Sequence, residues 1–188
     1  MKPHLIVRTG LVLLALPAAL HAQPTSTSPD YVPPSEFGPR TGDSELTLGG
    51  GGGSSKDFDD SFGGVNGSYG YYFSDTLEGV VRQSINYVNP ERGGTAWNGS
   101  TRVAVDYHLF GRGALRPFVG VNAGYIYGDA VEDTWAAGLE AGGKYYVQPK
   151  TFIFALVDYA WLFDEAKDAD DRFDDGQFFW SVGIGFNF

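Results

Sequence analysis

The stretch WSVGIGFNF, residues 180–188, alternates large apolar residues with small or polar ones up to the end of the chain. Successive side chains of a β-strand point to opposite faces, so this alternation predicts a strand with one apolar face. The last residue is Phe188, an aromatic side chain at a position where soluble proteins usually have a poorly ordered end. The surroundings of this strand must therefore accept an apolar surface.

The same period of two recurs through most of the chain, and no segment has a convincing helical stripe. The alternating segments predict eight strands, at 44–53, 62–73, 77–87, 102–109, 116–127, 135–147, 151–163 and 175–188.

The connections between these segments alternate in length. Three are short, and the others are mostly longer and more acidic: 74–76, 111–115 and 148–150 against 54–61, 89–97, 128–133 and 164–176. Short turns on one rim and longer loops on the other are typical of a transmembrane β-barrel. We therefore predict an all-β fold, an eight-stranded antiparallel up-and-down transmembrane β-barrel with short periplasmic turns and longer acidic extracellular loops.

The region before the first strand divides into two segments. Residues 1–22 combine the basic Lys2 and Arg8 with a short apolar core and a plausible cleavage site after Ala22, as in a cleaved signal peptide. An uncleaved anchor is the alternative. Residues 23–42 carry five prolines among Ser and Thr, which predicts a flexible periplasmic arm. Residues 43–188 remain for the barrel.

Charge and cysteine content exclude several classes of protein. The formal net charge is −10, which argues against nucleic acid as a partner because that needs a basic surface. The chain has no cysteine, so disulfides and a lipid anchor on an N-terminal cysteine are excluded. We expect no cofactor.

The two faces of the predicted strands differ in charge. One face carries no charge in any strand, and the other mixes charged residues with glycine. The narrow interior of an eight-stranded barrel suits such a mixture, so we place the charged face in the lumen and the apolar face towards lipid. A soluble, lipocalin-like barrel is the alternative. The predicted lumen residues are Glu45, Glu78, Arg82, Arg102, Asp106, His108, Arg116, Glu140, Lys144 and Asp158.

Charged groups away from water must be paired, so these residues are expected to form an ion-paired plug. Arg82 and Asp106 are predicted at similar depth on adjacent strands, and Glu140 and Asp158 near one level. We expect Arg82, Lys144 or both to neutralise these carboxylates.

Four stretches resemble the proteobacterial outer-membrane β-barrel family of small eight-stranded proteins: YYFSDTLEGVVRQS (71–84), RPFVGVNAGYIYGD (116–129), EAGGKYYV (140–147) and DDGQFFWSVGIGFNF (174–188). The resemblance covers roughly residues 43–188. It implies a Gram-negative outer-membrane location, with outer-membrane lipid and lipopolysaccharide as surroundings. It also implies that the barrel-assembly machinery reads a C-terminal signal, here Trp180, Val182, Ile184, Phe186 and Phe188.

The family resemblance leaves the activity open, because one fold carries many functions. We expect a structural or surface-interaction role in the cell envelope, with the lumen plugged by charged side chains. A porin-like narrow channel or small-ligand uptake barrel is the main alternative. A lipid-modifying enzyme is a distant one, because His108, the only histidine after residue 22, is predicted near the periplasmic end, whereas lipid A chemistry belongs at the outer leaflet. We therefore predict no catalytic residue.

Two further motifs have simple interpretations. The segment DEAKDADDRFDDG (164–176) is predicted to be a solvated acidic loop; a divalent cation there, bridging to lipopolysaccharide or to the acidic residues of 57–60, is the alternative. The run GGGGG (49–53) lacks the residues of a phosphate loop. It is predicted to be a strand at the closing seam, covered by Trp180 and Phe178.

Overall fold

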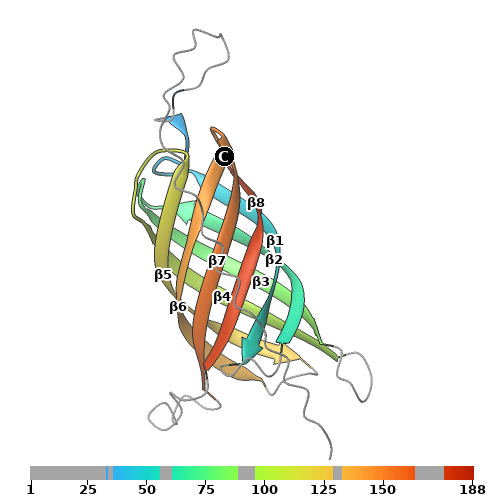
Figure 1. Cartoon of the computed structure of the whole chain (residues 1–188). Coiled ribbons are helices and arrows are strands. Elements are labelled where there is room, and N and C mark those ends of the chain that lie inside the picture. Colours follow the sequence, from blue (N-terminus) through green and yellow to red (C-terminus); the bar gives the residue numbers. More distant parts are fainter. Residues whose placement is uncertain (1–32, 34–35, 56–60, 89–95, 129–132, 164–175) are drawn as a thin grey trace, which may run out of the picture. The chain divides into compact units, whose positions relative to one another are not determined.

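Eight antiparallel strands form a closed barrel in the computed structural model, which describes residues 33, 36–55, 61–88, 96–128, 133–163 and 176–188 (Figure 1). Each strand pairs with the next, and the last pairs with the first. The strands are β1 (Ser44–Ser55), β2 (Ser61–Tyr72), β3 (Leu77–Val88), β4 (Ala96–His108), β5 (Leu115–Gly128), β6 (Thr134–Gln148), β7 (Thr151–Phe163) and β8 (Gly176–Asn187). The predicted eight-stranded antiparallel barrel is confirmed. No helix in the described ranges is long and apolar enough to cross a membrane.

Two strands extend further than their sequence pattern indicated. Strand β4 begins at Ala96, where the sequence predicted a loop up to residue 97, and Ala96 pairs with Val88 of β3. Strand β1 continues through the glycine run to Ser55. Apart from Ala96 and Trp97, both extensions consist of glycine and small polar residues, which give a weak apolar alternation. Backbone pairing with the neighbouring strands sets these bounds, not side-chain hydrophobicity.

The closing seam joins β1 to β8, and Gly49 lies opposite Gly183. On the lumen side the ring of Phe154 lies against both: a Cβ atom would be 3.0 Å from this ring at Gly49 and 2.8 Å at Gly183. The predicted covering of the glycine run by Trp180 and Phe178 stays a prediction; Trp180 lies opposite Gly52, and Phe178 lies opposite Ser54. Trp180 is 52% exposed on the outer face, and Phe178 packs against Tyr159 at 4.8 Å between ring centroids. The glycines make room for an aromatic ring inside the barrel.

The outer face of the barrel is apolar and exposed, as predicted. Leu48, Val65 and Ile184 each leave 60% or more of their surface uncovered. Aromatic pairs lie near the strand ends, for example Tyr87 with Trp97 at 5.0 Å between ring centroids. Such rings near strand ends are typical of the interfacial girdles of membrane barrels.

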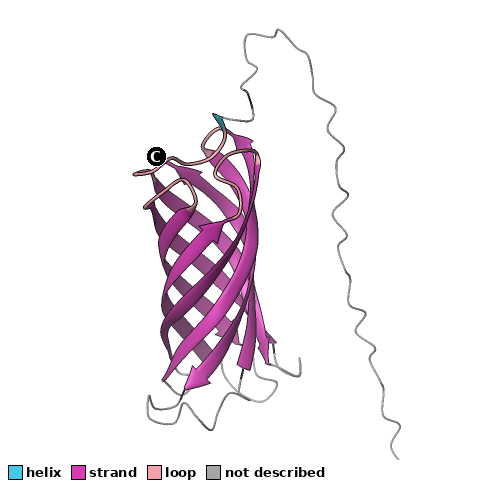
Figure 2. Ribbon diagram, turned by 90° about the vertical axis from the view of Figure 1, so that its left-hand side faces the viewer, coloured by secondary structure: helices cyan, strands magenta, loops and turns pink. Residues whose placement is uncertain are grey.

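One end of the barrel carries the short connections 73–76, 109–114 and 149–150 together with the C-terminus, and we call it the turn end (Figure 2). The opposite end is the loop end. Residues 36–43, here named the N-terminal strap, pack against the turn end, with hydrogen bonds from Gly38 N to Pro149 O (3.0 Å) and from Gly113 N to Phe37 O (3.3 Å). Most of the predicted arm, 23–42, lies outside the described residues.

Candidate functional site

The predicted lumen residues all lie on the inner face of the barrel. All are buried except Arg82, whose side chain is 16% exposed. Inner positions alternate with outer ones along each strand, which is why residues separated by two or four in sequence, such as Arg102, Asp106 and His108, share the lumen. The described inner face is therefore lined by buried charged side chains, which suits the narrow interior of an eight-stranded barrel.

The cluster nearer the turn end is centred on the ammonium group of Lys144. Its Nζ atom lies 2.6 and 2.8 Å from the two carboxylate oxygens of Glu45 and 2.8 Å from Oε2 of Glu78. It also donates to the hydroxyl of Tyr72 at 2.9 Å, and this hydroxyl donates to Glu45. The Oε2 atom of Glu78 also lies 3.0 Å from Nε2 of His108. One cation thus holds two carboxylates from different strands.

The cluster nearer the middle of the barrel contains two arginine–carboxylate pairs. Arg82 donates to both carboxylate oxygens of Glu140, at 3.0 and 3.2 Å, and Arg102 donates to Asp158. The amide of Asn122 bridges the two acids, 2.6 Å from Glu140 Oε2 and 3.2 Å from Asp158 Oδ1. A guanidinium that bonds both carboxylate oxygens fixes orientation as well as charge. These pairs therefore connect strands on different sides of the lumen.

Part of the predicted pairing agrees with this arrangement. Glu140 does lie opposite Asp158, and Arg82 does neutralise Glu140. Of the two predicted cations, Arg82 takes this role, and Lys144 pairs with Glu45 and Glu78 instead.

The predicted common level of Arg82 and Asp106 is also wrong. Arg82 lies opposite Arg102, and Asp106 lies opposite Glu78. The error arose from counting back from a loop that is shorter than predicted, since β4 starts at Ala96.

Asp106 differs from the other lumen acids because it makes no ion pair with a described residue. Its carboxyl group contacts Glu140, and its Oδ1 atom has no hydrogen-bond partner within the described residues. A Cβ atom at Gly120 would overlap Oδ1, so this oxygen fills the space that the glycine leaves. Four cationic residues face five carboxyl groups in the lumen, and Asp106 is the unmatched acid.

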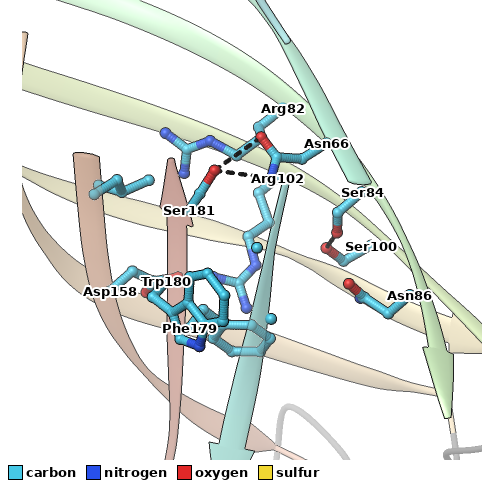
Figure 3. A pocket seen from close by; sticks show the side chains of 13 residues that line it. Asn66, Arg82, Ser84, Asn86, Ser100, Arg102, Asp158, Phe179, Trp180 and Ser181 are labelled. Atoms are coloured by element: carbon cyan, nitrogen blue, oxygen red, sulfur yellow. Dashed lines mark hydrogen bonds and ion pairs between the residues drawn. The ribbon is translucent and has the colours of Figure 1, made fainter. Parts of the chain in front are cut away.

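Small cavities lie inside the described barrel, and two of them adjoin the charge clusters. One, of about 50 Å³, lies among Asn66, Ser84, Asn86, Ser100 and Ser181 (Figure 3). The other, of about 20 Å³, lies beside Glu45, Asp106 and Lys144. Arg82 and Leu156 line both cavities. A cavity must offer roughly 10–15 Å³ to hold one water molecule, whereas ligand pockets are of the order of hundreds of Å³. These cavities therefore suit a few water molecules and not a larger ligand.

Several lumen partners were missed by sequence reasoning. Tyr72, Asn122, Tyr146 and Asn187 all bind within the clusters; Asn187, for example, donates to Glu45 at 3.0 Å and accepts from Tyr146 at 2.7 Å. The prediction considered only charged residues. The position of Tyr72 on the same strand face as Ser68 and Gly70 was the available signal.

His108 has no arrangement typical of a nucleophilic enzyme. It is fully buried, and its described neighbours are Glu78, the hydroxyl of Tyr72 at 3.4 Å and the ring of Phe118. A base that activates a nucleophile must reach both the nucleophile and the substrate, and the buried position of His108 does not favour this.

The acidic segment proposed to bind a divalent cation lies at 164–175, outside the described residues, as do Asp57, Asp59 and Asp60. Its acids are Asp164, Glu165, Asp168, Asp170, Asp171, Asp174 and Asp175. Among the described residues, no group of three or more metal-ligating side chains is assembled.

Comparisons with known proteins give the fold. No protein-family model and no curated protein matches the chain. Among solved structures, the outer membrane protein OprG of Pseudomonas aeruginosa matches with a TM-score of 0.55 and 14% identity, over 81% of this chain and 98% of that one. Neisserial surface protein A matches with a TM-score of 0.57 and 15% identity, over 78% of this chain and 96% of that one. Ail, the attachment invasion locus protein of Yersinia pestis, matches with a TM-score of 0.51 and 16% identity, over 79% of this chain and 99% of that one.

The chain therefore has the fold of the small eight-stranded outer-membrane β-barrels of proteobacteria, as its sequence predicted. At these identities the likeness establishes the fold alone.

Proposed function

We propose that this protein is an integral outer-membrane β-barrel with a structural or surface-interaction role, whose lumen is closed by paired charged side chains. The observation that supports this proposal is the set of charged contacts across the lumen. Lys144, Arg82 and Arg102 each bind carboxylates across it, and the two cavities that Arg82 and Leu156 line are small, about 50 and 20 Å³. A barrel that transports nothing through its lumen acts through its surface.

The outer face supports a position in a membrane. Large apolar side chains are exposed around the barrel, and closure leaves no strand edge, as lipid requires. We place the turn end in the periplasm and the loop end outside, after removal of residues 1–22. The partners are then outer-membrane lipid and lipopolysaccharide, with a divalent cation at 164–176 as an additional proposal.

The names of two structural neighbours agree with a surface role. One is a surface protein and another is an attachment invasion protein. The segments at the loop end of this chain are acidic, which gives them a chemistry of their own for contact with the surroundings.

The same geometry makes the alternatives less favourable. A channel or uptake barrel needs a continuous path or a ligand-sized pocket, and a lipid-modifying enzyme needs reacting groups that reach the outer leaflet. His108 is buried near the turn end and held by Glu78.

Surface labelling of intact cells tests the placement. The chain has no cysteine, so single cysteines can be introduced as reporters at Ala169, in the long acidic segment, and at Arg112, in a short turn. We expect a membrane-impermeant maleimide to label Ala169→Cys in intact cells, and Arg112→Cys only after the outer membrane is permeabilised. Labelling of Arg112→Cys alone in intact cells would reverse the orientation, and recovery of both variants in the soluble fraction would refute the membrane proposal.

A further inference from the structure

The N-terminal strap touches all three short connections of the barrel. Gly38 bonds to Pro149 and Phe37 to Gly113, as described above. Thr41 donates to Asp75 Oδ1 through its backbone N at 2.9 Å and through Oγ1 at 3.0 Å. These three contacts lie on the connections β6–β7, β4–β5 and β2–β3, so the strap spans the mouth at the turn end.

The strap also buries residues over the lumen. Pro39 is among the fully buried side chains, although it precedes the first strand. Beside the preceding residue, Gly38, lies Arg116, a fully buried lumen residue of β5 whose Nη2 atom donates to the backbone oxygen of Asp75 at 2.5 Å. A buried proline outside the barrel wall and a buried arginine inside it mean that the strap covers the end of the lumen.

The backbone path of the strap depends on one glycine, Gly38. Gly38 has φ +104°, a conformation that other residues rarely adopt. A Cβ atom at Gly38 would lie 2.6 Å from Arg116 Nη1 and 3.2 Å from its Cδ. Gly38 is therefore required both for the turn of the backbone and for the close approach to Arg116.

We propose that the N-terminal strap, residues 36–43, is a docked seal that closes the lumen at the turn end, independently of the charge clusters around Lys144 and Arg82. The lumen then has two barriers in series, one made of side chains within the barrel and one made of a chain segment that can dock and release. Release of the strap exposes Arg116 to water without movement of the strands.

Neighbouring strap positions provide a matched pair of reporters. Pro39 is buried and Arg40 is exposed, and the chain has no other cysteine to interfere. In the full chain, folded in detergent, we expect a maleimide to modify Pro39→Cys on the order of 100-fold more slowly than Arg40→Cys, because local opening must precede the reaction. Adding Gly38→Ala to each should bring the two rates together. Gly128→Ala, at the loop end of β5, is the control for backbone strain, since its φ is +133° and it lies at the opposite end of the barrel from the strap.

A disulfide measures docking without altering Pro39. Thr41→Cys with Asp75→Cys should oxidise rapidly within the folded barrel, and Thr41→Cys with Leu109→Cys, on the outer face, should not. The disulfide result decides the question where the two measurements disagree, because Pro39→Cys can itself free the strap.

Equal rates for Pro39→Cys and Arg40→Cys, together with no preference for the 41–75 disulfide in a folded barrel, would overturn the proposal. This failure would leave the closed lumen unaffected, since conductance tests that separately.

Discussion

The Nζ atom of Lys144 lies 2.6 Å from Oε1 and 2.8 Å from Oε2 of Glu45, across the lumen from β6 to β1. These strands are not neighbours in the barrel, so the contact joins opposite sides of the wall. Arg82 of β3 reaches Glu140 of β6, and Arg102 of β4 reaches Asp158 of β7, in the same way. Side chains thus connect the wall across its interior.

Removal of Lys144 should leave two buried carboxylates without their cation. We predict that Lys144→Ala lowers the free energy of unfolding by about 3–5 kcal/mol, as expected when one partner of a buried pair is removed. Denaturant unfolding in lipid vesicles measures it. The matched control, Lys144→Met with Glu45→Gln and Glu78→Gln, removes the charges together and should cost much less. A loss below about 1 kcal/mol for Lys144→Ala would show that water already screens the cluster.

Gln83 is a polar residue on the outer face, and both the oxygen and the nitrogen of its side-chain amide form hydrogen bonds. It accepts from Thr101 at 2.7 Å and donates to the hydroxyl of Tyr127 at 2.8 Å. Thr101→Val should destabilise the barrel by about 1–3 kcal/mol in lipid, because the amide oxygen is left unpaired. Gln83→Leu with Thr101→Val should restore most of this stability. Equal unfolding curves for the two variants would argue against a lipid-exposed position.

The ring of Phe154 requires the glycines beneath it. Gly183→Ala should destabilise the barrel by about 1–3 kcal/mol, since the new Cβ would lie 2.8 Å from this ring and closer to Leu48 O. Gly67→Ala, on the outer face with its nearest atom at 3.5 Å, is the control and should be tolerated. If both substitutions have the same effect, glycine is required at the seam for another reason.

Asp75 gives the strap a dependence on pH. The two hydrogen bonds from Thr41 hold the pKa of Asp75 below its ordinary value of 3.8. A carboxyl group with a lowered pKa stabilises the folded state above its ordinary pKa, and this contribution is lost as the pH falls through the folded value. Strap docking should therefore be unchanged from neutral pH to about pH 4 and weaken below it. Thr41→Pro removes the backbone donor as well as the hydroxyl, and an NMR titration in which this variant leaves the pKa of Asp75 unchanged would refute the link.

The C-terminal residue tests the predicted assembly signal. Phe188 pairs with Ser44 of β1, through hydrogen bonds of 2.8 and 2.9 Å, and its side chain is exposed on the outer face. Deletion of Phe188 should reduce insertion in cells more than it reduces the stability of barrels that are already folded. Pulse-chase assembly and unfolding of the purified protein separate the two effects. Normal insertion would refute the signal while leaving the strand intact.

Strand alternation was sufficient to predict the fold and the inner face, because a barrel imposes one side-chain period on every strand. Register was harder. Asp106 lies opposite Glu78 and not opposite Arg82, because the start of β4 at Ala96 is determined by backbone pairing in a segment with little apolar pattern. The strap was not predicted, since FGPRTGD (37–43) has the composition of a linker and its contacts are made with turns distant in sequence.

The closed lumen is tested most directly by planar-bilayer conductance of the full chain at neutral pH. We predict no discrete current steps from protein whose barrel is shown to be folded, because Lys144 and Arg82 hold their carboxylates across the lumen. Regular steps from the unaltered protein, enlarged by Lys144→Ala, would contradict the closed lumen and establish a channel.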